Sequence, residues 1–388
     1  MLLRLALELL CIITSVTSDR YQLVPRPLDS VIPERFYEQN GRVNQPPLIT
    51  LTEPETIQNE PLYMLIIVRS SSHHFQRRDA IRLTWGNVSD TAEGRVSLVF
   101  VVGKSADPTV HSLLLLESQQ HKDLLYVGFE DTYANLTLKD LAVFQYARKL
   151  MAHCQYLAIA GDEIVLDISG VVQFLADAYD DVAINQHQSE GVRELSICYE
   201  FPCCTPVIRE NSSKYLVQNG YYEGTLYPSY CSGTFFVIHM GLVGEIYNMM
   251  LDTPFFMPDD VWLGIIYQKL GIRLHDSHLN FAGISSYKRE LRLLKLAKSP
   301  EFYNNRVFVT ILDYAFKTEN VASKIIEMWS IIGTQKRLGM GQVVRPPQYN
   351  NFIWVLAIVI LLFLVYKSPF KNWLIRYFIF SLWSKSRK

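Results

Sequence analysis

The sequence lacks an excess of charge of either sign, because its 388 residues include 37 Lys and Arg against 38 Asp and Glu. No global field draws such a chain to nucleic acid, so we expect no nucleic-acid partner. Cysteine is also scarce, and none of the six cysteines has the spacing of a zinc site. Internal repeats and low-complexity segments are absent, which excludes a repeat protein.

The longest apolar runs lie near the two ends of the chain. Residues 1–19 place Arg4 ahead of an apolar run and end in small residues. This pattern predicts either a signal peptide cleaved near Ser18 or a short signal anchor. Residues 351–367 hold an uncharged apolar block slightly short of the roughly 20 residues that span a bilayer, and we interpret it as a transmembrane helix. A buried helix is the alternative.

Residues 368–388 contain several Lys and Arg and no acidic residue. The positive-inside rule therefore predicts a basic cytosolic tail, with everything before the span in the lumen. Three glycosylation sequons, at Asn87, Asn135 and Asn211, agree with this orientation. In an oxidising lumen the five cysteines outside the leader allow two disulfides and one spare thiol, and their pairing stays open.

The body of the chain alternates between strand and helix patterns. Residues 20–60 are rich in Pro, Asn and Gln and predict a stem, followed by a folded lumenal domain over residues 61–345. Apolar runs predict strands at 62–70, 95–103, 123–131 and 155–163, separated by helical patterns at 73–86, 108–121 and 136–154. This alternation predicts an α/β fold with a parallel sheet wrapped by helices. From about residue 195 the pattern loosens into aromatic and turn residues, before helices at 257–271 and 320–332.

An acidic turn interrupts the apolar stretch "LAIAGDEIVLD", residues 157–167, at Gly161, Asp162 and Glu163. Ligands of such sheets bind beyond the carboxyl ends of the strands, so this turn is a candidate site; a plain surface turn is the alternative. A lumenal α/β domain with an acidic strand end suggests chemistry on a nucleotide sugar. Carboxylates that hold Mn²⁺ or Mg²⁺ commonly neutralise the diphosphate of such a donor.

Six motifs follow one another in a recognisable order: "RRDAIRLTWGN" (77–87), "FVVG" (100–103), "FEDTYANLTLKDL" (129–141), "GDE" (161–163), "YPSYCSG" (227–233) and "PDDVWLG" (258–264). Over residues 62–285 the series resembles the β-1,3-glycosyltransferases of the galactosyltransferase and N-acetylglucosaminyltransferase type, which are related to Fringe. The resemblance implies a GT-A type nucleotide-sugar fold with a mixed, mostly parallel sheet, in a Golgi or ER membrane enzyme. The family usually has a single N-terminal anchor, and the C-terminal span departs from that pattern.

The resemblance also implies an activity. It is the transfer of galactose or N-acetylglucosamine from a UDP-sugar to a glycan on a glycoprotein or glycolipid. The transfer would form a β-1,3 linkage by inversion and depend on a metal. A glycoside hydrolase would instead need two carboxylates about the scissile bond, and the nucleotide-sugar motifs speak against it.

The family's acidic turn is altered in this chain. Its three aspartates fall on Gly161, Asp162 and Glu163, and the lysine before them falls on Ile159. Glu163 keeps a carboxylate one methylene further out and is the implied metal ligand, although Asp162 can take over part of that role. His278 can complete the metal site, with an exposed loop histidine as the alternative. The lost aspartate at Gly161 also leaves open a catalytically inactive relative that acts as a glycan-binding or chaperone-like protein.

The acidic pair Asp259 and Asp260 matches the motif that holds the family's catalytic base. We expect Asp260 to be the base and Asp259 its neighbour, since an inverting transfer needs one carboxylate near the attacking hydroxyl. Capping of the following helix is a competing role for either. The other predicted site residues are Arg78, Arg82, Asp162 and Lys139 for the donor, and Tyr227, Tyr230 and Gly233 for an acceptor wall on which tyrosine rings stack against sugar faces. Arg78 and Arg82 lie one helical turn apart on one face, and pairing with acidic groups is their alternative role.

Overall fold

The computed structural model describes residues 48–55, 61–184, 194–210, 213, 215–217, 222, 224–255, 257–282, 290–304, 306–312 and 321–337. The predicted leader at 1–19, the transmembrane helix at 351–367 and the basic tail at 368–388 lie outside these residues, as does most of the stem. Within the described part of the chain, no helix combines the length and the apolar character that crossing a bilayer requires.

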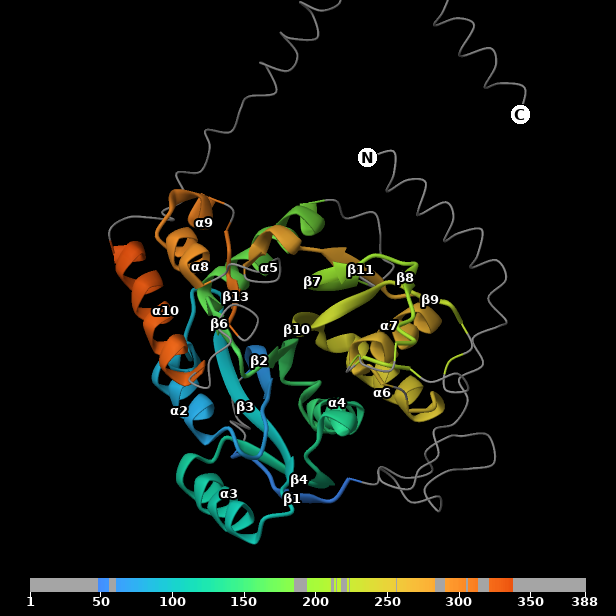
Figure 1. Ribbon diagram of the computed structural model, residues 1–388. Coiled ribbons are helices and arrows are strands. Elements are labelled where there is room, and N and C mark those ends of the chain that lie inside the picture. Colours follow the sequence, from blue (N-terminus) through green and yellow to red (C-terminus); the bar gives the residue numbers. More distant parts are fainter. Residues whose placement is uncertain are drawn as a thin grey trace, which may run out of the picture. The chain divides into compact units, whose positions relative to one another are not determined.

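The centre of the fold is a mixed sheet with the strand order β1-β4-β3-β2-β5-β10-β7-β11. β2, β3, β4 and β5 pair in parallel, whereas β10 runs antiparallel between β5 and β7. This arrangement confirms the predicted mixed, mostly parallel sheet (Figure 1). The strands are β1 (Thr50–Thr52), β2 (Leu62–Arg69), β3 (Arg95–Lys104), β4 (Leu124–Glu130), β5 (Cys154–Gly161), β7 (Glu194–Phe201), β10 (Tyr230–His239) and β11 (Arg273–Asp276).

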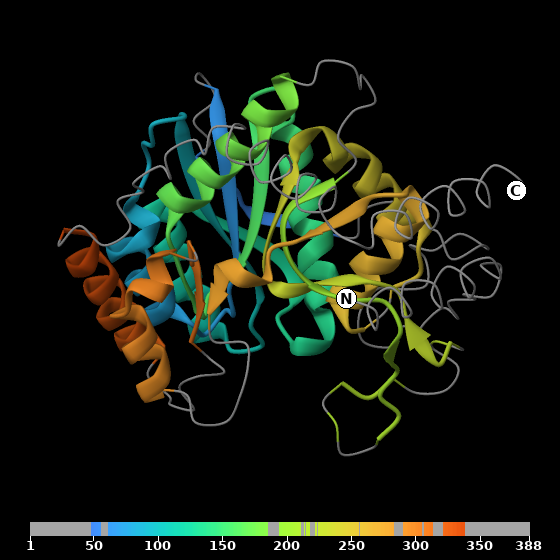
Figure 2. The ribbon, with the colours of Figure 1, turned by 90° about the horizontal axis from the view of Figure 1, so that it is seen from above.

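Helices lie on both sides of this sheet, as its central strands require. β2 and β5 are buried along almost their whole length, which is why they appear in the sequence as continuous apolar runs. In Figures 1 and 2 the helices α4 (Leu136–Ala147), α6 (Val243–Asp252) and α7 (Asp259–Leu270) lie on one side. α2 (Phe75–Leu83) and α10 (Val321–Arg337) pack against each other on the other side. Residues from both layers of helices can therefore reach the carboxyl ends of the parallel strands.

Smaller elements complete the fold. β6 (Ile164–Leu166) follows β5 after the turn Asp162–Glu163, so the acidic turn does join two strands. β6 belongs to a second sheet with the order β12-β13-β6, and β8 pairs with β9 in a short ribbon. The remaining elements are α3 (Pro108–His121), α5 (Ile168–Ile184), β8 (Thr205–Pro206), β9 (Leu226–Tyr227), β12 (Phe281–Ala282), α8 (Glu290–Ala297), α9 (Pro300–Asn304) and β13 (Val309–Ile311).

The loosened sequence pattern after residue 195 hides two strands of the main sheet. β7 and β10 lie side by side there, and a disulfide between Cys198 and Cys231 joins them with a Cα–Cα distance of 5.5 Å. Register shifts interrupt the pairing between Cys231 and Phe236 and again before Ile238, so the alternation of apolar and polar residues is broken. The sequence pattern therefore predicted neither strand.

Two of the three sequons differ sharply in exposure. Asn87 is exposed, whereas Asn135 is 3% exposed and its amide nitrogen donates to the carbonyl of Glu130 at 2.8 Å. Asn211 lies outside the described residues.

Because a glycan needs the amide nitrogen of its asparagine in solvent, we expect Asn135 to stay unmodified in the folded protein. Mass spectrometry of the chain secreted or retained by a eukaryotic host should find glycan at Asn87 and none at Asn135; glycan at Asn135 of folded protein would contradict the burial.

Candidate functional site

A cavity of about 470 Å³ opens beyond the carboxyl ends of β2 and β5. It collects side chains from segments far apart in the sequence, as expected for the ligand edge of an α/β sheet. The charged lining residues are the carboxylates Glu163, Asp259 and Asp260, with Arg69 as the only Lys or Arg among them. The aromatic and apolar lining residues, called the aromatic wall below, include Tyr133, Leu136, Phe201, Pro206, Ile208, Tyr215, Tyr227 and Tyr230.

Arg69, the last residue of β2, joins the elements around the cavity. Its guanidinium donates to Asp140 on α4 and to Asp259 on α7, each at 2.8 Å, and also to the carbonyl of Gly233 on β10. Burial would lower the pKa of Arg69, but the charges of Asp140, Asp259 and Glu163 raise it well above its ordinary value. The guanidinium is thus a fixed positive charge that holds four elements together.

Asp259 and Asp260 are the first two residues of α7, and they have different surroundings. Asp259 accepts a hydrogen bond from Arg69, whereas Asp260 accepts one from the amide of Val261 at 2.9 Å. Burial, followed by the negative charge of Asp259, raises the pKa of Asp260 to about 7. Neither aspartate is the N-cap residue of α7, because Pro258 occupies that position, so the alternative of N-capping was wrong.

A close approach between α7 and β10 sets the position of Asp260. A Cβ added at Gly264 would lie 2.5 Å from the Cβ of Tyr230 and 2.8 Å from the carbonyl oxygen of Ser229. Only a glycine allows helix and strand to come so close. The contact places the start of α7, with its carboxylates, directly beside the tyrosines of the cavity wall.

The predicted acceptor residues Tyr227, Tyr230 and Gly233 all line the cavity. Tyr230 stacks on Phe201 with ring centroids 5.0 Å apart and meets Tyr227 edge to face at 6.3 Å. Burial and the charge of Asp260 raise the pKa of Tyr230, so its hydroxyl stays protonated and can donate to a ligand. The wall therefore offers flat apolar surface with a polar edge.

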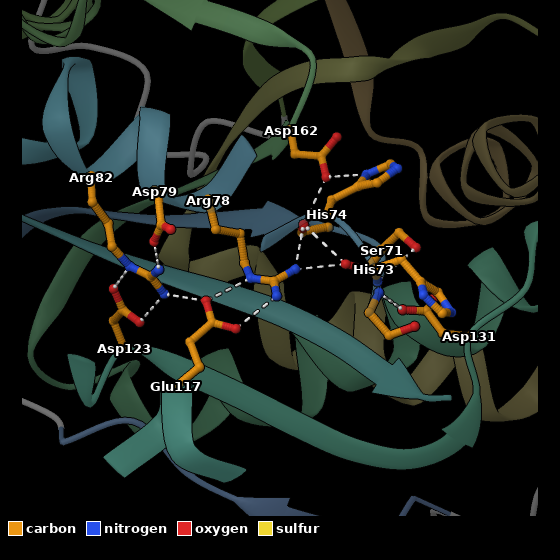
Figure 3. A network of polar contacts seen from close by, with 12 residues as sticks. Ser71, His73, His74, Arg78, Asp79, Arg82, Glu117, Asp123, Asp131 and Asp162 are labelled. Atoms are coloured by element: carbon orange, nitrogen blue, oxygen red, sulfur yellow. Dashed lines mark hydrogen bonds and ion pairs between the residues drawn. The ribbon is translucent and has the colours of Figure 1, made fainter. Parts of the chain in front are cut away.

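Asp162 is not among the residues that line the cavity, and it ties three elements together, as Figure 3 shows in part. It accepts from Ser70 at 2.7 Å and from Arg77 at 2.9 Å, and one of its oxygens lies 2.7 Å from Nδ1 of His74. Burial would raise the pKa of Asp162, but His74, Arg77 and Ser70 together lower it to about 2. Both carboxylate oxygens thus have protein partners.

Arg78 and Arg82 take part in an ion-pair network on α2 rather than lining the cavity (Figure 3). Arg78 is fully buried and binds both oxygens of Glu117 at 2.8 and 2.7 Å. Arg82 binds both oxygens of Asp123 and also reaches Glu117. A bidentate carboxylate partner satisfies most of each guanidinium, so the contacts in this structure are structural. Donor binding by these two arginines stays a prediction.

Lys139 is similarly occupied. Its ammonium donates to the carbonyl of Ser70 at 2.6 Å and to Asp131 at 2.7 Å, and the residue is 2% exposed. Asp131 in turn accepts from the amides of Ser72 and Gly103. Lys139 therefore fastens the carboxyl ends of β2, β3 and β4 to one another, and any donor role stays a prediction.

Comparisons with known proteins identify the family. The galactosyltransferase family pattern matches residues 76–278, just over half of the 388-residue chain. The chain belongs to the galactosyltransferase family. This match and the relatives below confirm the predicted resemblance to β-1,3-glycosyltransferases.

Two relatives of this galactosyltransferase-family chain illustrate the likeness. The lactosylceramide 1,3-N-acetyl-beta-D-glucosaminyltransferase A of Danio rerio is 30% identical over 242 residues, which cover 60% of this chain and 61% of that protein. The acetylgalactosaminyl-O-glycosyl-glycoprotein beta-1,3-N-acetylglucosaminyltransferase of Mus musculus is 29% identical over 217 residues, 54% of this chain and 52% of that protein. The chain thus matches between half and two thirds of these relatives' length.

A solved 4-diphosphocytidyl-2C-methyl-D-erythritol synthase from Anaerococcus prevotii matches with a TM-score of 0.29 and 11% identity. The match covers 53% of this chain and 84% of the synthase chain. So weak a likeness assigns no fold subtype, and the GT-A subtype stays a prediction.

The predicted metal ligands of this family member do not form a complete site by themselves. The described residues contain no group of three or more His, Cys, Asp or Glu side chains placed to hold an ion. Asp162 is bound by protein donors, and His278 is exposed and paired with Asp276 at 2.7 Å. Glu163 alone of the three lines the cavity. One carboxylate fits Mg²⁺ or Mn²⁺ only where substrate phosphates and water supply the other ligands, which is a common arrangement for Mg²⁺.

Sequence reasoning about this family member missed Arg69, Asp140 and Phe201. Asp140 lies inside a helix pattern and has no local signal of function. Arg69 had one signal, because a charged residue at the end of a strand that is otherwise buried needs a partner.

Proposed function

We propose that this chain transfers a hexose from a UDP-sugar to a glycan acceptor on a glycolipid or glycoprotein. We further propose a β-1,3 linkage formed with inversion, dependence on Mn²⁺ or Mg²⁺, and a lumenal site in the Golgi or ER membrane. The names of the relatives favour N-acetylglucosamine over galactose as the transferred sugar.

The observation that carries this proposal is the placement of Asp260. Asp260 lines the same cavity as Glu163 and the aromatic residues, and burial with the charge of Asp259 raises its pKa to about 7. A general base works best when its pKa lies near the operating pH. Asp259 is held by Arg69 and is the less suitable member of the pair.

The residues of this chain suggest the course of the transfer. Stacking on Tyr227, Tyr230 and Phe201 would hold the acceptor sugar with one hydroxyl toward Asp260. As Asp260 takes the hydroxyl proton, the oxygen would bond to the anomeric carbon of the donor from the face opposite the diphosphate. The bond from that carbon to the diphosphate oxygen would break at the same time, and UDP would leave with the electron pair.

The charge of the cavity supports the need for a cation. Glu163, Asp259 and Asp260 line it against the single guanidinium of Arg69, which is itself paired with Asp140 and Asp259. A diphosphate would be repelled by such a surface. A divalent ion beside Glu163 would neutralise the donor diphosphate and stabilise the departing UDP.

The test uses the full-length chain, expressed in the secretory pathway of a host cell and purified in detergent. UDP release and product would be measured with UDP-N-acetylglucosamine or UDP-galactose and a lactoside acceptor, in Mn²⁺, in Mg²⁺ and in EDTA. We expect release from one donor, dependence on the cation, and a new β-1,3 linkage by NMR. Glu163→Gln should lose activity.

The alternative, a catalytically inactive glycan-binding or chaperone-like relative, predicts a different result. No donor would release UDP with any cation, and calorimetry would detect glycan binding without binding of the nucleotide sugar. That outcome would reject the transferase proposal.

A further inference from the structure

The carboxylate of Glu163 occupies the space that a side chain at position 161 would fill. A Cβ built on Gly161 would lie 2.3 and 2.4 Å from the two carboxylate oxygens of Glu163, and 2.6 Å from its carboxyl carbon. These separations are far below any van der Waals contact. The Glu163 side chain therefore folds back over the end of β5 because residue 161 has no side chain.

The atoms in conflict are the far end of a flexible side chain and not backbone. A side chain at position 161 would push the Glu163 carboxylate aside, since the three atoms nearest to the added Cβ all belong to that side chain. Gly161 also has no left-handed backbone angle, since the positive-φ glycines of the described chain are Gly94 and Gly271. An alanine can therefore be accommodated at position 161 without backbone strain.

The folded-back position is the one that matters for the cavity. Glu163 is half-buried and lines the cavity, and its negative charge contributes to raising the pKa of Arg69. The turn's other carboxylate, Asp162, is held by Ser70, His74 and Arg77. The position of the Glu163 side chain therefore decides whether the turn presents a carboxylate to the cavity.

We propose that Gly161 is a positioning residue, whose missing side chain lets a carboxylate as long as that of Glu163 lie over the end of β5 and face the donor. Position 161 and position 163 then act as one unit in which a shorter residue at one allows a longer residue at the other. This inference rests on the proposed function for its catalytic consequence, although the geometry itself can be tested without turnover.

The first variant is Gly161→Ala, which displaces the Glu163 carboxylate without removing it. We expect kcat/KM to fall about 100-fold, because a misplacement of about 1 Å in an active site costs that much. The melting temperature should stay within about 3 °C of the wild type, since no backbone contact changes. The double variant Gly161→Ala/Glu163→Gln should be no worse than Glu163→Gln alone, because both changes remove the same interaction.

A suppressor distinguishes positioning from general damage. Shortening the side chain in Gly161→Ala/Glu163→Asp withdraws the carboxylate from the added methyl group, so part of the lost kcat/KM should return. The matched control is Gly170→Ala on α5, whose Cβ would lie 2.8 Å from a carboxylate oxygen of Asp167, away from the cavity. This control should keep wild-type turnover.

Carbodiimide labelling of carboxylates with glycine ethyl ester, read by mass spectrometry, tests the geometry without activity. Labelling of Glu163 should rise in Gly161→Ala, while Asp162 in the same peptide stays protected by its partners. If wild-type protein never turns over but the labelling changes as expected, the proposed function fails and the positioning survives. Unchanged labelling, full turnover in Gly161→Ala, or additive losses in the double variant would overturn the positioning role.

Discussion

Replacing Asp260 by Asn should lower kcat/KM by about 10²- to 10⁴-fold, the usual contribution of a general base. Donor affinity should change little, since this carboxylate faces the acceptor side of the cavity in the proposed reaction. Steady-state kinetics with saturating donor, together with calorimetric titration of the UDP-sugar, measure the two effects separately. Asp259→Asn is the matched control: it removes the neighbouring carboxylate but not the base, and activity should fall less.

The pH dependence follows from the raised pKa of Asp260. The base must be ionised, so kcat/KM should fall about tenfold per pH unit as the pH drops below about 7. Stability has the opposite sign, because a carboxyl whose pKa is raised by folding favours the folded state only while protonated. The wild type should therefore lose stability relative to Asp260→Asn as the pH rises from about 4 through about 7. A pH profile of kcat/KM that stays flat between pH 5 and 8 would contradict the assignment of Asp260.

Replacing Arg69 by Met should destabilise the fold by about 3–5 kcal/mol, the range for leaving a buried charge without its partner. The substitution leaves both Asp140 and Asp259 without their bonds to the guanidinium, and Asp140 is fully buried. Burial raises the pKa of Asp140 to about 7 even beside Arg69, and loss of the cation should raise it further. The destabilisation should thus be larger at pH 8 than at pH 5, measured by urea unfolding.

Two variants separate the ion pair from simple loss of volume. Arg69→Met/Asp140→Asn removes one of the two stranded carboxylates and should recover part of the stability, whereas Arg69→Lys keeps a charge and should lose less than Arg69→Met. A loss below about 1 kcal/mol in Arg69→Met, typical of an exposed ion pair, would show that Arg69 does not hold the cavity together.

Local patterns in the sequence were enough to predict the parallel strands of the main sheet and the helices between them. Strands β2 to β5 are covered on both faces and appear as unbroken apolar runs, and the helices between them repeat at three to four residues. The acidic turn and the start of α7 were also visible as carboxylates at element ends. β7 and β10 were not, because irregular register and close packing of aromatic residues leave no simple period.

The candidate site, like the fold, was predicted in part. The family motifs, the chemical types of the residues and the carboxylates Glu163 and Asp260 were visible in the sequence. The three-dimensional packing was needed to show that Arg78, Arg82, Lys139 and Asp162 are held by other protein groups, while Arg69 reaches the cavity. Such partnerships join residues between 8 and 190 positions apart, so no local pattern carries them. The same holds for Gly161, because a missing side chain matters only through what folds into its space.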